Sequence, residues 1–415
     1  MGQGVAVDGS GNEVGVGSFT GTVDFGGGPL TSTAGYDMFM AKYSPAGAHL
    51  WSKSLGSTGN DYAYGVALDG SGNVLVTGYF SGTMDFGGGP LTIEGSQDVF
   101  VAKYSPAGTY LWALAPTGSG WGSGAGLTAD ADSNVVVGGY FGGTLDFGCG
   151  TMSSSGVSDA FLAKYSAAGA CLWSRDIGGT GTNTRATAVA VNGNGDIVVT
   201  GGFQGAVDFG GGALTSAGSY DVFVAAYSAT GAPQWSMRFG DTGYDYGYGV
   251  TVDGGGNVLV AGSFQGTVNF GGGPVASVGA FYGADIFMAK YTSAGAYVWA
   301  KDFGSGFSEV AYGIAADAGG NISLTGSIVG GVNFGTGYLF GSGNYDIFIA
   351  RFTPNGTNLW AKRSGGPSDD RGKAVTADSN GNVIATGSFA QSVDFGGGLM
   401  TTNGGANAYA VKLTP

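Results

Sequence analysis

The sequence predicts an all-β protein built from seven copies of one unit, and three observations support this prediction. Tryptophans recur at spacings of 61, 61, 62, 64 and 61 residues between Trp51 and Trp360. The tripeptide Asp/Asn-Phe-Gly recurs seven times at nearly the same spacing, and no window of the sequence keeps a helical period. A repeat of this length indicates radial or stacked copies of one supersecondary unit. The phenylalanines of the tripeptide are Phe25, Phe86, Phe147, Phe209, Phe270, Phe334 and Phe395.

The second unit shows the strands that we expect in every copy. Residues 64–69 are expected to form strand A, 74–80 strand B, 98–105 strand C and 109–114 strand D. In each run, apolar residues alternate with others, and β-branched and aromatic residues are frequent. Short turns rich in Gly, Asn or Asp join consecutive strands, except between B and C. Residues 81–97 form a long glycine-rich connection between B and C. Four antiparallel strands per copy describe a propeller blade, and twisted sheets packed face to face close into a ring. We therefore predict a seven-bladed β-propeller with strand A innermost and strand D outermost.

The chain is expected to form a single domain over residues 1–415. Seven copies of strands A, B and C are present but only six of strand D, because the sequence stops at VKLTP. The last blade should therefore lack its outer strand and expose an edge that can pair with another chain. The alternative is that the chain is a fragment of a longer repeat array. The approximate repeats are 1–61, 62–122, 123–184, 185–245, 246–309, 310–370 and 371–415.

Composition and charge exclude several classes of partner. The chain is 43% hydrophobic, which is enough apolar material for a large core, and contains 88 glycines but only 10 prolines. The formal net charge is −14, so phosphate backbones would be repelled and nucleic acid is not an expected partner. No apolar run approaches the roughly 20 residues that span a bilayer, so membrane insertion is not expected. No export signal is present within this sequence.

The repeats resemble a known bacterial family. Residues 65–80, GVALDGSGNVLVTGYF, followed by residues 98–112, DVFVAKYSPAGTYLW, are similar to the SBBP β-propeller repeat of cell-surface and secreted proteins. The resemblance extends over essentially the whole chain, seven times. It implies a propeller fold and an extracellular or cell-surface location. It implies no particular activity, because propellers host lectins, enzymes and scaffolds alike.

The stretch VDFGGGPLTS at residues 23–32 superficially combines a kinase metal-binding motif with a phosphate loop. A kinase would need further motifs and helices, and a phosphate loop would need a helix after the glycines. Neither is present, so we predict a structural role. The phenylalanine is expected to wedge between blades, and Asp24 and its counterparts are expected to bond nearby backbone or a basic partner. Asn269 and Asn333 replace the aspartate in two copies, and an amide can keep such a backbone bond.

A basic residue recurs in strand C. We predict that it makes a repeated contact with an aspartate within or between blades, whereas a site for a ligand is the alternative. Ala226 alone breaks this series. The basic residues are Lys42, Lys103, Lys164, Arg351, Lys290 and Lys412.

Metal and catalytic sites find little support in the sequence. The A–B turns place oxygens at calcium-loop spacing, best at Asp130, Asp132 and Asn134, but one carboxylate per turn is typical and an Asx-type turn explains the pattern. Calcium at these three residues is the one weak metal candidate, and we expect no other cofactor. A single histidine and two cysteines exclude His/Cys metal sites, and no catalytic residue is assigned. A carboxylate pair for glycoside hydrolysis stays open among the 29 acidic residues.

Cys149 lies in a B–C connection and Cys171 follows a C–D turn. The strand directions place these two segments on opposite faces of a blade, so a disulfide is left open.

The connections that differ most between copies are the D–A loops, which share a face with the B–C connections. Exposed aromatic side chains beside Asp and Asn suit sugars, because rings stack on sugar faces while carboxylates and amides bond hydroxyls. The tyrosines that recur before the strand-A glycine, Tyr64, Tyr248 and Tyr312, are expected to be structural. The candidate ligand-binding residues are Tyr62, Trp121, Tyr244, Tyr246, Phe281, Tyr282, Phe307, Asp61, Asp245 and Arg371.

These observations favour a non-enzymatic extracellular recognition or scaffold module that binds glycan or protein on the D–A/B–C face. One alternative is a carbohydrate-active enzyme with a carboxylate pair at the channel mouth. The other is a structural building block that assembles through the open edge of blade seven.

Overall fold

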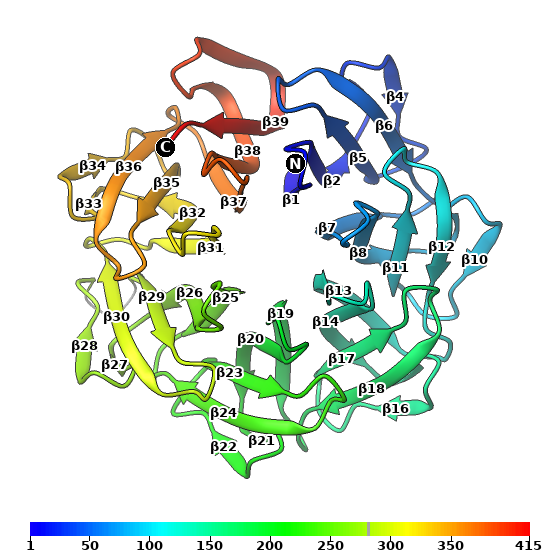
Figure 1. The fold of residues 1–415 in the computed structure, drawn as a ribbon, viewed down its shortest axis with the longest axis horizontal. Coiled ribbons are helices and arrows are strands. Elements are labelled where there is room, and N and C mark those ends of the chain that lie inside the picture. Colours follow the sequence, from blue (N-terminus) through cyan, green and yellow to red (C-terminus); the bar gives the residue numbers. More distant parts are fainter. Residues whose placement is uncertain (280–282) are drawn as a thin grey trace.

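The computed structural model describes residues 1–279 and 283–415 and shows seven antiparallel sheets arranged around a central axis (Figure 1). The predicted seven-bladed all-β propeller is confirmed. In blades one to six the strands follow the order A-B-C-D, with A nearest the axis. Within the described residues, no helix is long and apolar enough to cross a membrane.

The four strands of each blade occupy equivalent positions. The innermost strands are β1 (Gly2–Val7), β7 (Tyr62–Leu68), β13 (Trp121–Ala129), β19 (Asn183–Val191), β25 (Tyr246–Val252), β31 (Val310–Ala316) and β37 (Arg371–Ala377). The second strands are β2 (Glu13–Phe19), β8 (Val74–Phe80), β14 (Val135–Gly142), β20 (Ile197–Gln204), β26 (Val258–Phe264), β32 (Ile322–Ile328) and β38 (Val383–Asp394). The third strands are β5 (Asp37–Tyr43), β11 (Asp98–Tyr104), β17 (Asp159–Tyr165), β23 (Asp221–Tyr227), β29 (Asp285–Tyr291), β35 (Asp346–Phe352) and β39 (Leu399–Leu413). The outer strands are β6 (His49–Leu55), β12 (Tyr110–Leu114), β18 (Cys171–Ile177), β24 (Pro233–Phe239), β30 (Tyr297–Phe303) and β36 (Asn358–Ser364).

The Asp/Asn-Phe-Gly tripeptide turns a short hairpin inside each B–C connection. Asp24 Oδ1 accepts the amide N–H groups of Gly26 at 2.7 Å and Gly28 at 3.0 Å, and both glycines have φ near +108° that disfavours other residues. Asn269 makes the equivalent bonds through its amide oxygen, as predicted. The hairpins are β3 (Thr22–Asp24) with β4 (Pro29–Thr31), β9 (Thr83–Asp85) with β10 (Pro90–Thr92), β15 (Thr144–Asp146) with β16 (Thr151–Ser153), β21 (Ala206–Asp208) with β22 (Ala213–Thr215), β27 (Thr267–Asn269) with β28 (Pro274–Ala276), and β33 (Gly331–Asn333) with β34 (Tyr338–Phe340). The structural role predicted for this motif is confirmed.

The apolar core lies between the blades rather than at the centre of the ring. Phe86, for example, is 2% exposed and packs with Phe100 of its own blade against Val14 and Met38 of the preceding blade. Similar clusters join each successive pair from blade one to blade seven. Burying both apolar faces of every sheet is what closes the ring.

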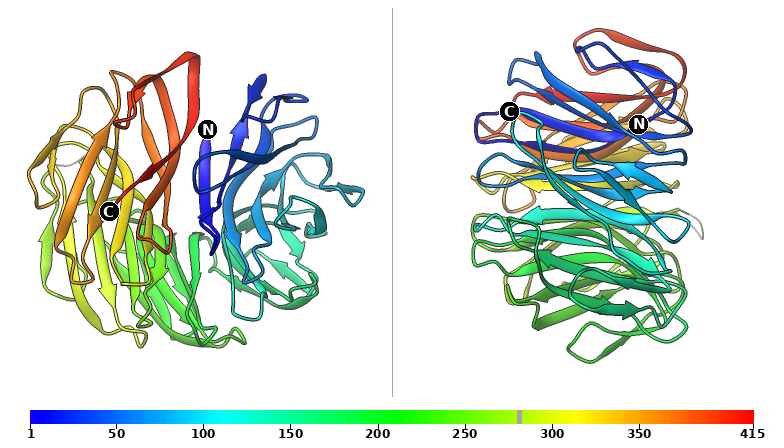
Figure 2. Two further views of the ribbon diagram at one scale, coloured as in Figure 1. Left: turned by 45° about the horizontal axis from the view of Figure 1, so that its top comes forward. Right: turned by 90° about the vertical axis from the view of Figure 1, so that its right-hand side faces the viewer.

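Blade seven contains three strands, in the order β37-β38-β39, so the predicted absence of its outer strand is confirmed. Figure 2 shows this blade beside blade one, where the ring closes. Lys412 Nζ lies 3.4 Å from Glu13 Oε1 of blade one and 3.0 Å from Asp378 Oδ2 of its own blade. An ion pair therefore crosses the junction.

Cys149 and Cys171 form a disulfide, with their Cα atoms 5.7 Å apart. The expectation that they lie on opposite faces was wrong. The β15–β16 hairpin folds back along the outer wall of blade three and lies beside β18, so the tip of the B–C connection reaches the start of the outer strand.

Candidate functional site

Every innermost strand carries a β-bulge at the same position. In β7, for example, Ala63 pairs with Gly78 and Gly65 pairs with Thr77, which leaves Tyr64 as the extra residue. A bulge re-aims the side chain of the extra residue, here into the central channel. The seven residues, named the bulge ring, are Gln3, Tyr64, Ala125, Thr187, Tyr248, Tyr312 and Lys373.

The bulge ring lines a cavity of about 410 Å³ at the D–A/B–C end of the channel. The innermost strands enter the channel at this end, so residues just before the bulge contribute as well, together with Tyr140 of the neighbouring strand β14. The further lining residues are Ser123, Tyr140, Arg185, Ala186 and Tyr246. The small side chains of Ala125 and Thr187 leave room on the side of blades three and four. A cavity of this size accepts a ligand of a few rings.

Tyrosine rings form a continuous contact along one side of the mouth. The centroids of Tyr246 and Tyr248 lie 5.2 Å apart, and those of Tyr248 and Tyr312 lie 5.1 Å apart. Burial raises the pKa of Tyr248 to about 12 and raises the pKa of Tyr64 further. These phenols are therefore neutral hydrogen-bonding groups at physiological pH, with ring faces able to stack on a ligand.

Two cations lie on opposite arcs of the ring. The Lys373 ammonium is 3.8 Å from the centroid of the Tyr312 ring, and the Arg185 guanidinium carbon is 4.7 Å from the centroid of Tyr140. Burial, together with the neighbouring charge of Arg371, lowers the pKa of Lys373 to about 8. The lysine is still mainly protonated at neutral pH.

Four of the sequence-predicted aromatic residues lie on or near this mouth. Tyr246 lines the cavity, whereas Tyr62 stacks in a tyrosine cluster beside it and Trp121 contacts Tyr140 edge to face. Tyr244 lies farther out on the rim and is 60% exposed. The structure thus brings only one of the four into the cavity itself.

The candidate acids have a different environment from the one we expected. Asp61 and Asp245 are fully buried, and each caps its own D–A loop. Asp61 accepts the amide N–H groups of Ser57 and Ser81, and burial raises the pKa of Asp245 to about 7. Neither side chain faces solvent, so both hold loops in place.

The remaining candidates lie to one side of the channel. Phe307 is 57% exposed and lines a second hollow of about 470 Å³ with Tyr345 and Asp369. Arg371 stacks over Tyr345 at 4.3 Å and contacts Asp369 at 3.4 Å. Phe281 and Tyr282 lie outside the described residues.

Sequence reasoning assigned the recurring tyrosines to packing, but the structure places Tyr64, Tyr248 and Tyr312 in the cavity wall. Lys373 and Tyr140 were not selected at all. Aligning the seven repeats position by position would have pointed to these residues. Lys373 occupies the column of Tyr64, and this column varies although its neighbours are small and regular.

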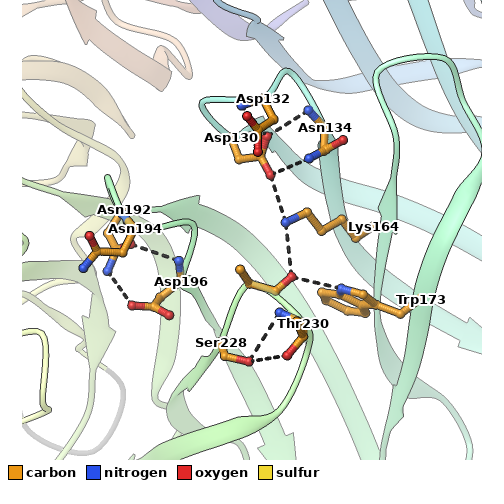
Figure 3. Close-up of polar contacts among 11 residues, drawn as sticks. Asp130, Asp132, Asn134, Lys164, Trp173, Asn192, Asn194, Asp196, Ser228 and Thr230 are labelled. Carbon is orange, nitrogen blue, oxygen red and sulfur yellow. Dashed lines mark hydrogen bonds and ion pairs between the residues drawn. The ribbon is translucent and has the colours of Figure 1, made fainter.

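The opposite face of the disc carries a repeated ionic contact, shown for blade three in Figure 3. Lys164 Nζ lies 2.9 Å from Asp130 Oδ2 and donates to the carbonyl oxygen of Ala229 in the next blade at 3.2 Å. Trp173 Nε1 donates to the same carbonyl at 3.2 Å. We name this arrangement the clasp, and it confirms the predicted lysine–aspartate contact. The clasp pairs are Asp8–Lys42, Asp69–Lys103, Asp130–Lys164, Asp253–Lys290, Asp317–Arg351 and Asp378–Lys412.

The clasp also accounts for the calcium-like spacing. Asp130 Oδ1 accepts the amide N–H groups of Asp132 and Asn134, while Oδ2 accepts the Asn134 side chain and Lys164 (Figure 3). Across the described residues, no group of three His, Cys, Asp or Glu side chains could hold a metal ion. The Asx-turn interpretation therefore accounts for the spacing of these residues, since both carboxylate oxygens of Asp130 are already bonded within the protein.

Blade four lacks both charged residues of the clasp. Ala226 replaces the lysine, and Asn192 replaces its aspartate partner. The carboxylate has moved to Asp196, which accepts the side-chain N–H of Asn192 at 3.1 Å and of Gln234 at 3.0 Å. Lysine and partner carboxylate are thus absent together, so no unpaired charge is buried.

Comparisons with known proteins agree with the repeat architecture. The family model described as SBBP, beta-propeller repeat, matches residues 50–79 and 234–263. An uncharacterized WD repeat-containing protein of Acanthamoeba polyphaga mimivirus is 24% identical over 442 residues, which cover 87% of this chain and 32% of that protein. The regulatory protein FlaEY of Caulobacter vibrioides is 27% identical over 242 residues, which cover 53% of this chain and 25% of that protein. The chain thus spans about a third or less of the length of these curated relatives.

Solved structures similar to this chain include the WD40 beta propeller domain of Doa1, with a TM-score of 0.45, 11% identity and 89% of both chains covered. Sqt1 from Chaetomium thermophilum also has a TM-score of 0.45, with 10% identity, and the match covers 93% of this chain and 79% of that one. The chain is a seven-bladed β-propeller, and two of its segments, residues 50–79 and 234–263, match the SBBP beta-propeller repeat.

Proposed function

We propose that this chain is a non-enzymatic binding module that takes a glycan at the bulge-ring mouth of its central channel. One observation carries the proposal. The β-bulges turn seven side chains, three of them tyrosines, into a cavity of about 410 Å³. Neutral tyrosines offer both ring faces for stacking and hydroxyls for hydrogen bonds, which are the two contacts that a sugar ring needs.

The cavity also counts against the enzymatic alternative. Among the described residues, its lining contains no aspartate or glutamate that could serve as one of a pair of catalytic carboxylates. The other alternative, assembly through blade seven, would use the outer edge of β39. A molar mass in solution above that of the 41.1 kDa chain would favour that alternative.

We also propose an extracellular or cell-surface location. The Cys149–Cys171 disulfide supports it, because such bonds persist in oxidising compartments. The SBBP-type repeats support it through the resemblance described above.

The test is a broad glycan array followed by titration of the best oligosaccharide. Tyr248→Ala should weaken binding by about three- to tenfold, since it removes one stacking surface from the cavity. Tyr338→Ala is the matched control, because Tyr338 is 64% exposed on the β33–β34 hairpin, outside the cavity. No oligosaccharide bound on the array, or equal effects of the two substitutions, would overturn the proposal.

A further inference from the structure

The charges in the bulge-ring cavity differ from those of the whole protein. The chain has 29 acidic and 15 basic residues, yet the lining of the cavity contains Arg185 and Lys373 and, among the described residues, no carboxylate. A channel with low-dielectric walls strengthens the field of the charges inside it. The mouth is therefore a local positive region on an acidic molecule.

Among the residues that the structure describes, these two cations have no anionic partner. The structure describes salt bridges for the clasp residues, for Arg238 with Asp221, for Arg363 with Asp346 and for Arg371 with Asp369. Within the described part of the chain, neither Arg185 nor Lys373 takes part in a salt bridge. Their contacts are with tyrosine rings and, for Arg185, with the side-chain oxygen of Asn183 at 3.3 Å. Both retain the capacity to bind an incoming anion.

A buried hydroxyl is a second, independent feature of the site. Ser123 is 1% exposed and lines the cavity beside Tyr140, and its Oγ has no hydrogen-bond partner in the described structure. Buried hydroxyls are normally hydrogen-bonded, so this serine keeps an unused hydrogen-bonding capacity in the cavity wall. A serine hydroxyl can donate to an oxyanion or bond a sugar hydroxyl.

We infer that the ligand of the bulge-ring mouth is an acidic saccharide, whose carboxylates pair with Arg185 and Lys373 while its rings stack on the tyrosines. This inference rests on the glycan-binding function proposed above and names its substrate class. The two cations lie in blades four and seven, on opposite arcs of the ring. An oligomer with a charge on each sugar can therefore reach both.

The experiment compares two probes of the same shape: a galacturonic acid trimer and its fully methyl-esterified, uncharged form. Binding is measured by calorimetry at pH 6 and low salt, where Lys373 is protonated. We expect the acid to bind at least tenfold more tightly than the ester. Lys373→Gln and Arg185→Gln should each weaken binding of the acid by about ten- to a hundredfold, as expected when a charged hydrogen bond is lost. The loss should be smaller for the ester, because the ester has no carboxylate to pair with either cation.

Lys362→Gln is the control, because this lysine is exposed on outer strand β36 and stacks on Trp360. The melting temperature of each variant shows whether the variant is folded. If one of Lys373→Gln and Arg185→Gln fails to fold, the other still tests the inference. Equal binding of acid and ester would overturn the inference while leaving the glycan-binding function intact. Binding of neutral oligosaccharides on the array without any binding of the acid would do the same. Loss of all saccharide binding would overturn both, and binding of acidic peptides alone would replace the saccharide as the ligand.

Discussion

The buried carboxylates on the two faces of the disc have different kinds of partner. On the clasp face, the aspartates of the A–B turns are paired with lysine or arginine in six blades. On the D–A/B–C face, Asp98 and Asp245 are fully buried and bonded to backbone N–H groups without a cation, and of the buried carboxylates there only Asp221 and Asp346 pair with an arginine in the described structure. The comparison shows that one face is built for regular closure of the ring. The loops of the other face are held by their own buried carboxylates, and the proposed binding site lies on that face.

The largest expected effect of this difference is on the pH dependence of stability. Burial raises the pKa of Asp98, Asp245 and Glu309 to about 7. The folded state holds these protons more tightly than the unfolded chain, so the stability they contribute is complete below about pH 4 and is lost as the pH rises through about 7. For Asp69 and Asp130, burial raises the pKa, but the lysine and asparagine contacts outweigh it and lower the value below 3.8. Their contribution is present above about pH 4 and is lost in stronger acid.

Thermal unfolding followed from pH 2 to pH 9 should therefore show a maximum at about pH 4 to 5, with a fall on both sides. Asp98→Asn should flatten the fall toward neutral pH and leave the acid limb unchanged, because it removes a titrating group from one face only. A stability that rises steadily from pH 4 to pH 8 would contradict this assignment, in which the clasp face causes the fall in acid and the D–A/B–C face causes the fall toward neutral pH.

The second expected effect concerns a single clasp. Lys103→Met leaves the Asp69 carboxylate, whose side chain is fully buried, without its cation. Removing one partner of a buried pair costs about 3–5 kcal/mol of unfolding free energy. Adding Asp69→Asn and Asn73→Asp reproduces the arrangement of blade four and should recover most of that loss. Urea unfolding followed by tryptophan fluorescence gives the comparison.

Lys362→Met serves as the control for removal of a lysine, since that side chain is exposed and has no carboxylate partner among the described residues. If Lys103→Met lowers the free energy of unfolding no more than Lys362→Met does, the clasp does not stabilise the ring. The difference between the two faces would then have no effect on stability.

The repeats made much of the fold predictable, because periodic residues report packing that every copy shares. The spacing of Phe86 and its counterparts gave the blade count, and the recurring Lys103 column predicted an ion pair. The bulge at Tyr64 was hidden, because one extra residue in a strand reverses the alternation on which sequence reasoning depends. The Cys149–Cys171 bond was hidden for a related reason, since the hairpin folds back across the blade edge.

The site was harder to predict than the fold because its residues do not repeat. Asp61 and Asp245 looked exposed in glycine-rich loops, but the loops close over them and use their oxygens as caps. Lys373 and Arg185 have unlike sequence surroundings, and only the closed ring places them in the wall of the same cavity. No local pattern records that closure.

The smallest expected effect is also the sharpest test of the clasp, because blade four offers the same site without it. Ala226→Lys alone should destabilise the protein by about 1–3 kcal/mol, since it buries an ammonium opposite Asn192 instead of a carboxylate. Adding Asn192→Asp and Asp196→Asn supplies the carboxylate at the clasp position and should recover most of the loss. Asn192→Asp with Asp196→Asn, but without the lysine, should be destabilising as well. If the triple variant were no more stable than Ala226→Lys, the joint replacement of lysine and aspartate in blade four would not reflect charge balance, and the volume of the lysine chain would limit that site instead.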